Sequence, residues 1–435
     1  MADEPLEPDR LGFETLAVRA GVETDGRTGA SNIPIYLSSS FEFDDTEHAA
    51  SLFNLEIPGH IYSRISNPTV AAFEERMAAL EAGVAGLAGA SGQACFALIA
   101  LTLCNAGSQI VASTSLYGGT LNFLSHTLPR FGVTTSFVDV HDHAALEAAI
   151  TPKTRFVVIE TIGNPAMTVA DLPGLAAVAH AHGLPLVVDN TFSSPYLCRP
   201  ADWGGDIVFH SATKYISGHG SVIGGVVVDA GTFDWQGSGR FPMLTEPYAP
   251  YNGIVFVDQY GPAAFGARAR AEGMRDFGAC MSPEVAYRLL EGLESLPMRM
   301  DRHVANAGVV AAHLESAPGV RSVSYPGLAS HPDHNLAEKL MPRGAGGILA
   351  FTLEGGRQAG RRFIESTRIF THLANVGDSR SLVIHPASTT HAQLDSDTLR
   401  AAGIDEGLVR MSVGLETVDD LVADIDRALR AAARP

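Results

Sequence analysis

Lysine is rare in this chain of 435 residues, and its positions are therefore informative. Of the thirty basic residues, only Lys153, Lys214 and Lys339 are lysines. Arginine carries positive charge as well as lysine does, but it is not deprotonated in a protein. A primary amine condenses with an aldehyde to form a Schiff base, and a guanidinium does not. Lys214 follows a short apolar run and the hydroxyl residues Ser211 and Thr213, which makes it the candidate for amine chemistry.

The neighbours of Lys214 indicate which aldehyde fits. Hydroxyls at Ser211 and Thr213 are suited to a phosphate, and Asp189, at the end of an apolar run, could keep a pyridine nitrogen protonated. An aspartate that caps the following turn is the alternative. The segment Ser91-Gly92-Gln93 precedes a helical pattern and could present backbone N–H groups to a phosphate, with a plain N-cap as the alternative. The combination indicates pyridoxal phosphate.

Two further residues are candidates for ligand contacts. Tyr117 could stack on an aromatic cofactor, although a core tyrosine is the more common fate. Arg410 lies inside a strand-like run, which favours a bidentate partner such as a substrate carboxylate, with a structural salt bridge as the rival. The histidine pairs 141/143 and 180/182 flank polar positions, and we predict no metal site from them.

Composition excludes several classes of protein. Apolar residues make up 46% of the chain and charged residues 18%, as in a globular protein with a large core. The net charge of −18 argues against nucleic acid or an anionic membrane as a partner. Four scattered cysteines fit buried thiols in a reducing compartment. The acidic start, residues 1–5, lacks the apolar segment of a signal peptide, and we expect a cytoplasmic protein.

Apolar runs alternate with helical patterns from Pro68 onward, which predicts an α/β fold with a mainly parallel sheet covered on both faces. Helices are expected over 70–82, from Ser91 through Leu101, and over 283–292. Strands are expected over 109–112, 135–138, 156–160, 184–189 and 206–209. Functional groups collect at the carboxyl ends of such strands, where Asp189 and the segment 211–214 both fall.

Three parts of the chain are expected. Residues 1–70 form an N-terminal arm, irregular in structure, that lies on another subunit; residues 71–275 form the large cofactor-binding domain; and residues 276–435 form a smaller α+β domain with strands over 347–351 and 382–384. Residues 230–265, rich in Gly, Pro and Tyr, are interpreted as an excursion from the large domain.

Taken together, these motifs resemble the Cys/Met-metabolism family of pyridoxal-phosphate enzymes, of fold type I. The resemblance extends from about Thr15 to the C-terminus. It is carried by residues 62–64 with 67–69, 91–93, 187–192, 211–215 and 385–388.

The resemblance implies a role for each matching residue. Lys214 would hold the cofactor covalently, Asp189 would pair with the pyridine nitrogen, and Tyr117 would stack on the ring and act in catalysis. Ser91, Gly92, Gln93, Ser211 and Thr213 would bind the phosphate, and Asn164 would lie near the phenolic oxygen. Arg410, Asn375 and Tyr62 would contact the substrate. Tyr62 and Arg64 would reach the phosphate of a neighbouring subunit, which implies active-site-sharing dimers within a homotetramer.

Within the family, four segments are similar to O-acetylhomoserine sulfhydrylases: 117–120, 251–253, 275–278 and 375–378. This implies replacement of the acetyl group of O-acetylhomoserine by sulfide or a thiol in methionine biosynthesis. Asn252 departs from the histidine usual there. Methionine γ-lyases typically place cysteine at Gly119 and serine at Asn375. Alternatives are a γ-lyase or cystathionine synthase on the same scaffold, or a non-catalytic nucleotide-binding or sulfur-carrier protein. The sequence leaves open an acetyl or succinyl leaving group, sulfide or methanethiol as acceptor, and the source of sulfide.

Overall fold

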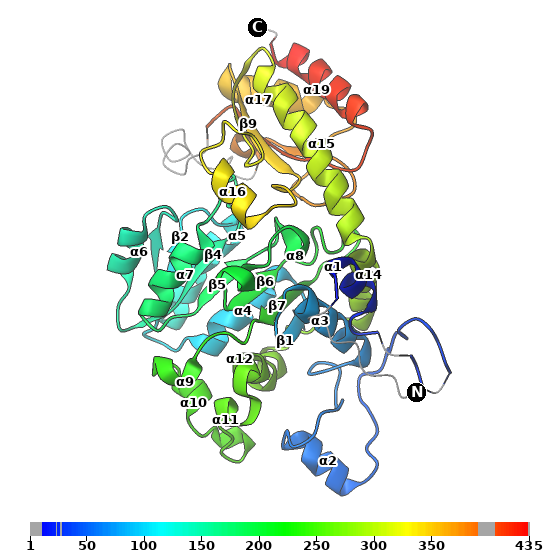
Figure 1. Cartoon of the computed structure of the whole chain (residues 1–435), viewed down its shortest axis with the longest axis vertical. Coiled ribbons are helices and arrows are strands. Elements are labelled where there is room, and N and C mark those ends of the chain that lie inside the picture. Colours follow the sequence, from blue (N-terminus) through cyan, green and yellow to red (C-terminus); the bar gives the residue numbers. More distant parts are fainter. Residues whose placement is uncertain (1–10, 23, 27, 390–404, 434–435) are drawn as a thin grey trace.

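A seven-stranded sheet forms the centre of the larger domain in the computed structural model, which describes residues 11–22, 24–26, 28–389 and 405–433 (Figure 1). Its strand order is β1-β7-β6-β5-β4-β2-β3. The strands are β1 (Ala85–Gly89), β2 (Gln109–Ser113), β3 (Thr134–Val138), β4 (Thr154–Glu160), β5 (Leu186–Asp189), β6 (Ile207–His210) and β7 (Gly225–Asp229). Strands β2 to β6 run parallel, and β7 is antiparallel to both β6 and β1. The predicted α/β fold is confirmed, and all five predicted strands of this domain are present.

Helices cover both faces of this sheet because its strands are apolar on both sides. On β5, Leu186 and Val188 belong to the core that contains α3 (Pro68–Leu80) and α7 (Leu172–Ala181). Val187 faces the opposite core, which contains α4 (Gly92–Leu103) and α12 (Ala264–Arg268). Such two-sided burial is expected of parallel strands. The other helices of this domain are α5 (Gly118–Asn122), α6 (His143–Ala149), α8 (Ser194–Leu197) and α13 (Arg275–Phe277).

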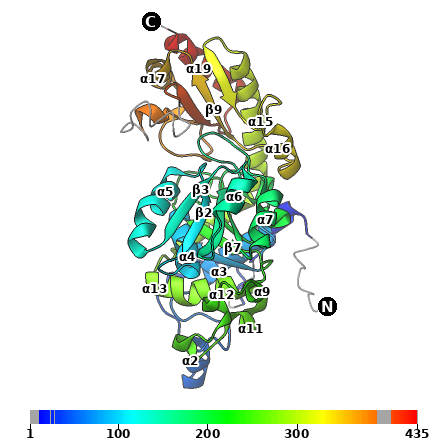
Figure 2. The ribbon, with the colours of Figure 1, turned by 90° about the vertical axis from the view of Figure 1, so that its left-hand side faces the viewer.

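A second sheet of five strands forms the smaller domain, in the order β10-β11-β12-β9-β8 (Figure 2). Its strands are β8 (Val320–Ser324), β9 (Ile348–Leu353), β10 (Thr371–His372), β11 (Leu382–Ile384) and β12 (Leu408–Ser412). Its helices are α15 (Leu296–Ser316), α16 (His334–Leu340), α17 (Gly356–Ser366) and α19 (Val418–Ala432). The preceding helix α14 (Pro283–Glu294) instead packs with α3 in the core of the larger domain. Helix α15, of 21 residues, runs from the larger domain along the smaller one (Figure 1). Within the described residues, each helix is too short or too polar to cross a membrane.

The part of the N-terminal arm that contains residues 46–53 lies away from the central sheet of the larger domain (Figure 1). The expectation of irregular structure is wrong at two segments, α1 (Phe13–Arg19) and α2 (Thr46–Phe53). Helix α1 forms because Leu16 and Ala17 are buried in the core of the larger domain. Helix α2 begins at Asp45, whose side chain caps the helix by accepting a hydrogen bond from His48 N at 2.7 Å. Residues 1–10, for which no signal peptide was predicted, lie outside the described residues.

The excursion folds into short helices, and its later part, around Asn252 and Gln259, contacts the arm. They include α9 (Trp235–Ser238), α10 (Pro242–Thr245) and α11 (Phe256–Tyr260). Asn252 has a φ of 53°, in the left-handed region that asparagine tolerates better than most residues. Its side-chain amide donates to Asn54 Oδ1 at 3.1 Å, and Gln259 Nε2 donates to the Leu55 carbonyl at 2.8 Å. Asn252 therefore closes a turn and joins the excursion to α2.

A buried carboxylate organises the smaller domain and makes its stability testable. Asp424 of α19 is 1% exposed, and it accepts hydrogen bonds from the backbone N–H groups of residues 368, 369 and 370. Asp424→Ala should lower the free energy of unfolding by more than about 2 kcal/mol, because three backbone N–H donors and Arg427 Nη2 lose a buried, charged acceptor. Chemical denaturation followed by circular dichroism measures the change. Exposed Asp420 of the same helix supplies the control, and equal effects of Asp420→Ala and Asp424→Ala would contradict the expectation.

Candidate active site

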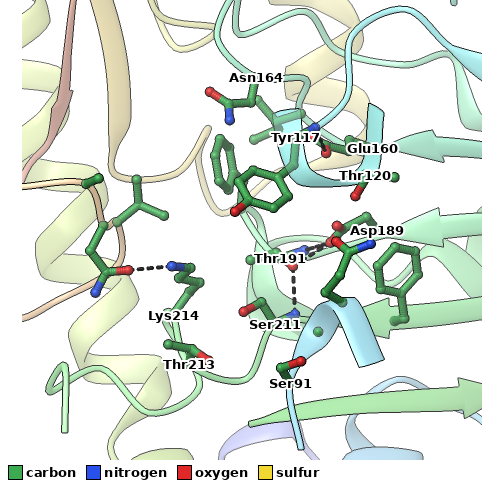
Figure 3. Close-up of a pocket in the computed structure, with 18 of the residues that line it drawn as sticks. Ser91, Tyr117, Thr120, Glu160, Asn164, Asp189, Thr191, Ser211, Thr213 and Lys214 are labelled. Carbon is green, nitrogen blue, oxygen red and sulfur yellow. Dashed lines mark hydrogen bonds between the residues drawn. The ribbon is translucent and has the colours of Figure 1, made fainter. Parts of the chain in front are cut away.

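A cavity of about 300 Å³ lies at the carboxyl ends of β4, β5 and β6, with the smaller domain closing its other side (Figure 3). The two domains contribute residues from segments far apart in the sequence. The predicted site residues that line it are Ser91, Gly92, Gln93, Tyr117, Asn164, Asp189, Ser211, Thr213, Lys214, Asn375 and Arg410. The structure thus brings together eleven of the thirteen residues predicted from sequence.

Lys214 points into the cavity from the segment that follows β6 (Figure 3). Its Nζ donates a hydrogen bond to Asn375 Oδ1 of the smaller domain. Burial, with Arg410 nearby, lowers the pKa of Lys214 to about 8, and Asp189 opposes this shift. A larger fraction of the amine is therefore uncharged near neutral pH than for an exposed lysine, as a nucleophile or base requires.

Asp189 ends β5 and faces the same cavity (Figure 3). Its Oδ1 accepts from the Thr191 hydroxyl and from Thr191 N at 3.0 Å. The Thr191 hydroxyl in turn accepts from Ser211 N at 2.9 Å, so this threonine joins the ends of β5 and β6. Burial raises the pKa of Asp189, while the bonds from Thr191 and the charges of His210 and Lys214 oppose the shift. A nearby cation would stabilise the ionised form.

Glu160 is a second buried carboxyl in the cavity, and the sequence reasoning missed it. It ends β4, and the strand register places it opposite Asp189. Burial and the adjacent Asp189 both raise the pKa of Glu160. Its Oε1 accepts from Tyr117 N, which fixes the backbone that carries the tyrosine ring. The sequence did contain a signal for Glu160: it is a carboxylic residue at the end of a predicted parallel strand, which is the same feature that identified Asp189.

Arg410 supplies positive charge from β12 of the smaller domain. Its Nη1 donates to Asn164 Oδ1 at 2.9 Å. Burial lowers the pKa of Arg410, and the charges of Tyr117, Glu160 and Tyr215 oppose the change. The guanidinium therefore donates to a neutral amide and faces a cavity, as is needed to bind a substrate carboxylate.

The opposite end of the cavity is built for close approach of an anion. Helix α4, of twelve residues, begins at Gly92 after the N-cap Ser91, whose hydroxyl accepts from Ala94 N at 3.1 Å. A side chain at Gly92 would place its Cβ 2.7 Å from Ser211 Cα, so only glycine fits here. Gln93 Nε2 is buried without a hydrogen-bond partner among the described residues. An uncompensated buried donor at a helix N-terminus fits a phosphate group.

Tyr117 precedes α5 and its ring projects over the cavity (Figure 3). The side chain is 55% exposed, so Tyr117 is not a core tyrosine. A Cβ on Gly119 would lie 2.4 Å from Tyr117 Cε1, so a larger residue at 119 would displace the ring. The glycine that distinguishes this chain from methionine γ-lyases thus bears directly on the ring.

Tyr62 and Arg64 are absent from the lining of this cavity, unlike the other predicted residues. Both are exposed, the Arg64 guanidinium carbon lies 5.5 Å from the centroid of the Tyr62 ring, and Arg64 Nη1 donates to the Arg275 carbonyl. The single chain therefore does not unite them with Lys214.

The histidine pairs have other partners. His180 Nε2 lies 2.7 Å from Asp206 Oδ2, and His141 Nε2 lies 3.0 Å from Asp333 Oδ1. Among the described residues, no group of three or more histidine, cysteine, aspartate or glutamate side chains could hold a metal ion.

The cavity fits pyridoxal phosphate by its own chemistry. A buried amine of lowered pKa suits an aldehyde. The pKa values of the neighbouring buried carboxyls Asp189 and Glu160 are both raised, and a protonated pyridine nitrogen beside them would favour their ionised forms. Gln93 has a buried donor without a hydrogen-bond partner among the described residues. The two-domain α/β architecture with a lysine after a sheet strand defines a fold-type-I pyridoxal-phosphate enzyme.

The comparisons with known proteins agree. The model of the Cys/Met metabolism PLP-dependent enzyme family matches residues 14–430, and the chain belongs to this family. It is 47% identical over 98% of its length to all of the homocysteine synthase of Schizosaccharomyces pombe. It is 45% identical over 97% of its length to 98% of the O-acetyl-L-homoserine sulfhydrylase of Leptospira meyeri.

A solved structure has the same fold over nearly the whole chain. The protein is from Campylobacter jejuni subsp. jejuni, is provisionally assigned as an O-acetylhomoserine (thiol)-lyase, and contains N'-pyridoxyl-lysine-5'-monophosphate. It matches with a TM-score of 0.92 and 36% identity, covering 97% of this chain and all of that chain. Dependence on pyridoxal phosphate and the expected fold type are confirmed.

The low pKa of Lys214 predicts unusual reactivity in cofactor-free protein. Because only the neutral amine is acylated, labelling of Lys214 by acetic anhydride should rise with pH around a midpoint of about 8. Mass spectrometry of digested, pulse-labelled protein gives the midpoint. Exposed Lys153 in the same sample supplies the reference curve. Identical curves for the two lysines would contradict the expectation.

Proposed function

We propose that this chain catalyses the replacement of the acetyl group of O-acetyl-L-homoserine by sulfide or a thiol. The products are acetate and L-homocysteine, or methionine from methanethiol, as in methionine biosynthesis. The observation that carries the proposal is the match, at 45–47% identity over nearly the whole chain, to relatives named homocysteine synthase and O-acetyl-L-homoserine sulfhydrylase. The cavity contains the charged groups that this reaction needs.

Each residue of the cavity has a proposed role. Bound pyridoxal phosphate supplies an electron-withdrawing ring that lowers the energy of charge developing at the substrate α-carbon. Asp189 keeps the pyridine nitrogen protonated, and Tyr117 covers the ring and takes part in catalysis. Arg410 and Asn375 bind the amino-acid substrate. Ser91, Gly92, Gln93, Ser211 and Thr213 bind the phosphate, and Asn164 lies near the phenolic oxygen.

Lys214 has two roles in this proposal. It holds the cofactor before substrate arrives, and afterwards its free Nζ removes the proton from the substrate α-carbon. The hydrogen bond from Nζ to Asn375 Oδ1 supports an orienting role for Asn375. A second proton leaves the β-carbon so that acetate can depart from the γ-carbon. The incoming sulfur then bonds to the γ-carbon, and protons return to the β-carbon and the α-carbon before the product leaves.

The arm supports a proposal about assembly. Exposed apolar side chains along it, including Ile35, Leu37 and Phe53, suit burial against another chain. We propose that Tyr62 and Arg64 complete the phosphate site of a neighbouring copy, that Tyr62 also contacts substrate there, and that two such dimers form a homotetramer. Under this proposal residues 1–70 act as the arm, 71–275 as the cofactor domain and 276–435 as the small domain. The free cysteines support a cytoplasmic location.

A substrate comparison tests the reaction. Purified protein given O-acetylhomoserine and sulfide should form homocysteine faster than it releases α-ketobutyrate from methionine alone. Faster release of α-ketobutyrate from methionine would assign the chain as a γ-lyase instead.

Lysine variants test the attachment of the cofactor. Lys214→Ala should be colourless or unable to turn over, and borohydride should leave no pyridoxyl adduct on its peptide that contains position 214. Lys153→Ala should keep colour and activity.

Hybrid oligomers test the shared site. Tyr62→Ala and Lys214→Ala should each lower turnover strongly, but differently tagged copies co-expressed and purified through both tags should regain activity. In the hybrid, the site on the Tyr62→Ala chain has an intact Lys214. The neighbouring Lys214→Ala chain supplies the Tyr62 that this site needs. Light scattering on the wild type gives the number of copies. Hybrids no more active than the parent variants would reject the shared site.

A further inference from the structure

A buried polar cluster lies on the side of the large sheet that faces away from the cofactor cavity. It consists of Glu81, which caps the C-terminus of α3, with Asn190 and His210. All three side chains are at most 1% exposed. Glu81 Oε1 accepts from Asn190 Nδ2 at 2.9 Å and from His210 Nε2 at 2.5 Å. The chemistry proposed above uses none of these residues.

The cluster joins the ends of three adjacent strands. Asn190 directly follows β5, and its Oδ1 accepts from the Thr161 hydroxyl, which directly follows β4, at 2.8 Å. His210 is the last residue of β6. The amide of Asn190 and the carboxyl of Glu81 thus link the carboxyl ends of β4, β5 and β6.

Asn190, His210 and the Thr161 that bonds to Asn190 are each the chain neighbour of a cavity residue. Thr161 follows Glu160, Asn190 follows Asp189, and His210 precedes Ser211. Successive side chains of a strand point to opposite faces, so the cluster and the cavity occupy opposite faces of the same strand ends. The strand register agrees with this division into two faces. Asp189 pairs with Phe209, and both line the cavity, whereas His210, the next residue after Phe209, does not.

The energetics favour a positioning role over a purely stabilising one. Among the described residues His210 is the ion-pair partner of Glu81, and Glu81 Oε2 and His210 Nδ1 have no hydrogen-bond partner. A buried ion pair with unsatisfied atoms is often no more stabilising than an apolar replacement of similar volume. It does, however, define strand positions more narrowly than apolar contacts, because hydrogen bonds have direction.

We propose that Glu81, Asn190 and His210 are positioning residues for the cofactor site. They hold Asp189 at a fixed place relative to Lys214, and a protonated His210 would favour the ionised form of Asp189. The inference rests on the cofactor site proposed above but not on the identity of the acyl substrate. Removing the cluster should therefore alter the bound cofactor itself, in the way that outer hydrogen-bond partners tune metal ligands.

The central variant is Glu81→Gln, which keeps the shape and removes the charge. We expect pyridoxal phosphate to bind the cofactor-free variant at least about tenfold more weakly, the scale seen for outer partners of a ligand site. We also expect a changed visible absorption spectrum of the bound cofactor at fixed pH. Titration followed by absorbance measures both quantities, and a melting curve on the same sample reports stability.

Asp229→Asn is the matched control. Asp229 is 3% exposed in the same sheet, but it pairs with Ile207 at the opposite end of β6 and accepts from the N–H groups of Gly231 and Gly266. This variant should lower the melting temperature and leave cofactor affinity and spectrum as in the wild type. The double variant Glu81→Gln/His210→Gln leaves no unpaired buried charge, so it remains informative if Glu81→Gln does not fold.

The readouts separate the outcomes. Weaker binding and an altered spectrum in Glu81→Gln or in the double variant, but not in Asp229→Asn, would support the positioning role. A lower melting temperature with wild-type affinity and spectrum in both cluster variants would overturn it. If the wild type itself failed to bind pyridoxal phosphate at Lys214, the proposed function would fall instead.

Discussion

The burial of one amine between two domains is the constraint on which the site depends. Burial in the cavity lowers the pKa of Lys214 to about 8; the charge of Arg410 adds to this shift and that of Asp189 opposes it. Neither domain alone creates this environment, since Asp189 ends a strand of the large sheet while Asn375 and Arg410 belong to the smaller domain. The relative placement of the domains therefore sets the chemistry of the lysine.

The large sheet positions the remaining cavity residues, because three of its parallel strands, β4, β5 and β6, end at the same edge. Glu160, Asp189 and Ser211 reach the cavity because they lie at or next to these ends. The same geometry places Thr161, Asn190 and His210 on the opposite side, where hydrogen bonds connect the strand ends. One face carries the reactive groups, and the other fixes their spacing.

Much of this was predictable because the signals are local. Apolar runs identified β2 to β6, and hydroxyls, a lysine and an aspartate after such runs identified one edge of the sheet. Strands β1 and β7 were not predicted. The sequence of β1, Ala85–Gly89, is rich in glycine and alanine and is typical of a turn; it forms a strand here because it pairs with β7. Glu81 could not be found from sequence because its partners lie more than a hundred residues away. The roles proposed for Tyr62 and Arg64 cannot be checked within one chain, since neither residue is among the described residues that line the cavity.

Replacement and elimination at the γ-carbon begin with the same proton transfers. The charged residues that assist these transfers therefore do not determine which of the two reactions follows. In their proposed roles, Lys214, Asp189 and Arg410 would serve both reactions. Selectivity must therefore come from residues that control which nucleophile reaches the γ-carbon and how the ring above it can move. Gly119 is such a position, because a side chain there would collide with the Tyr117 ring. Ile223, which lines the cavity and is 66% exposed, is another, since it can exclude water without offering a competing hydrogen bond.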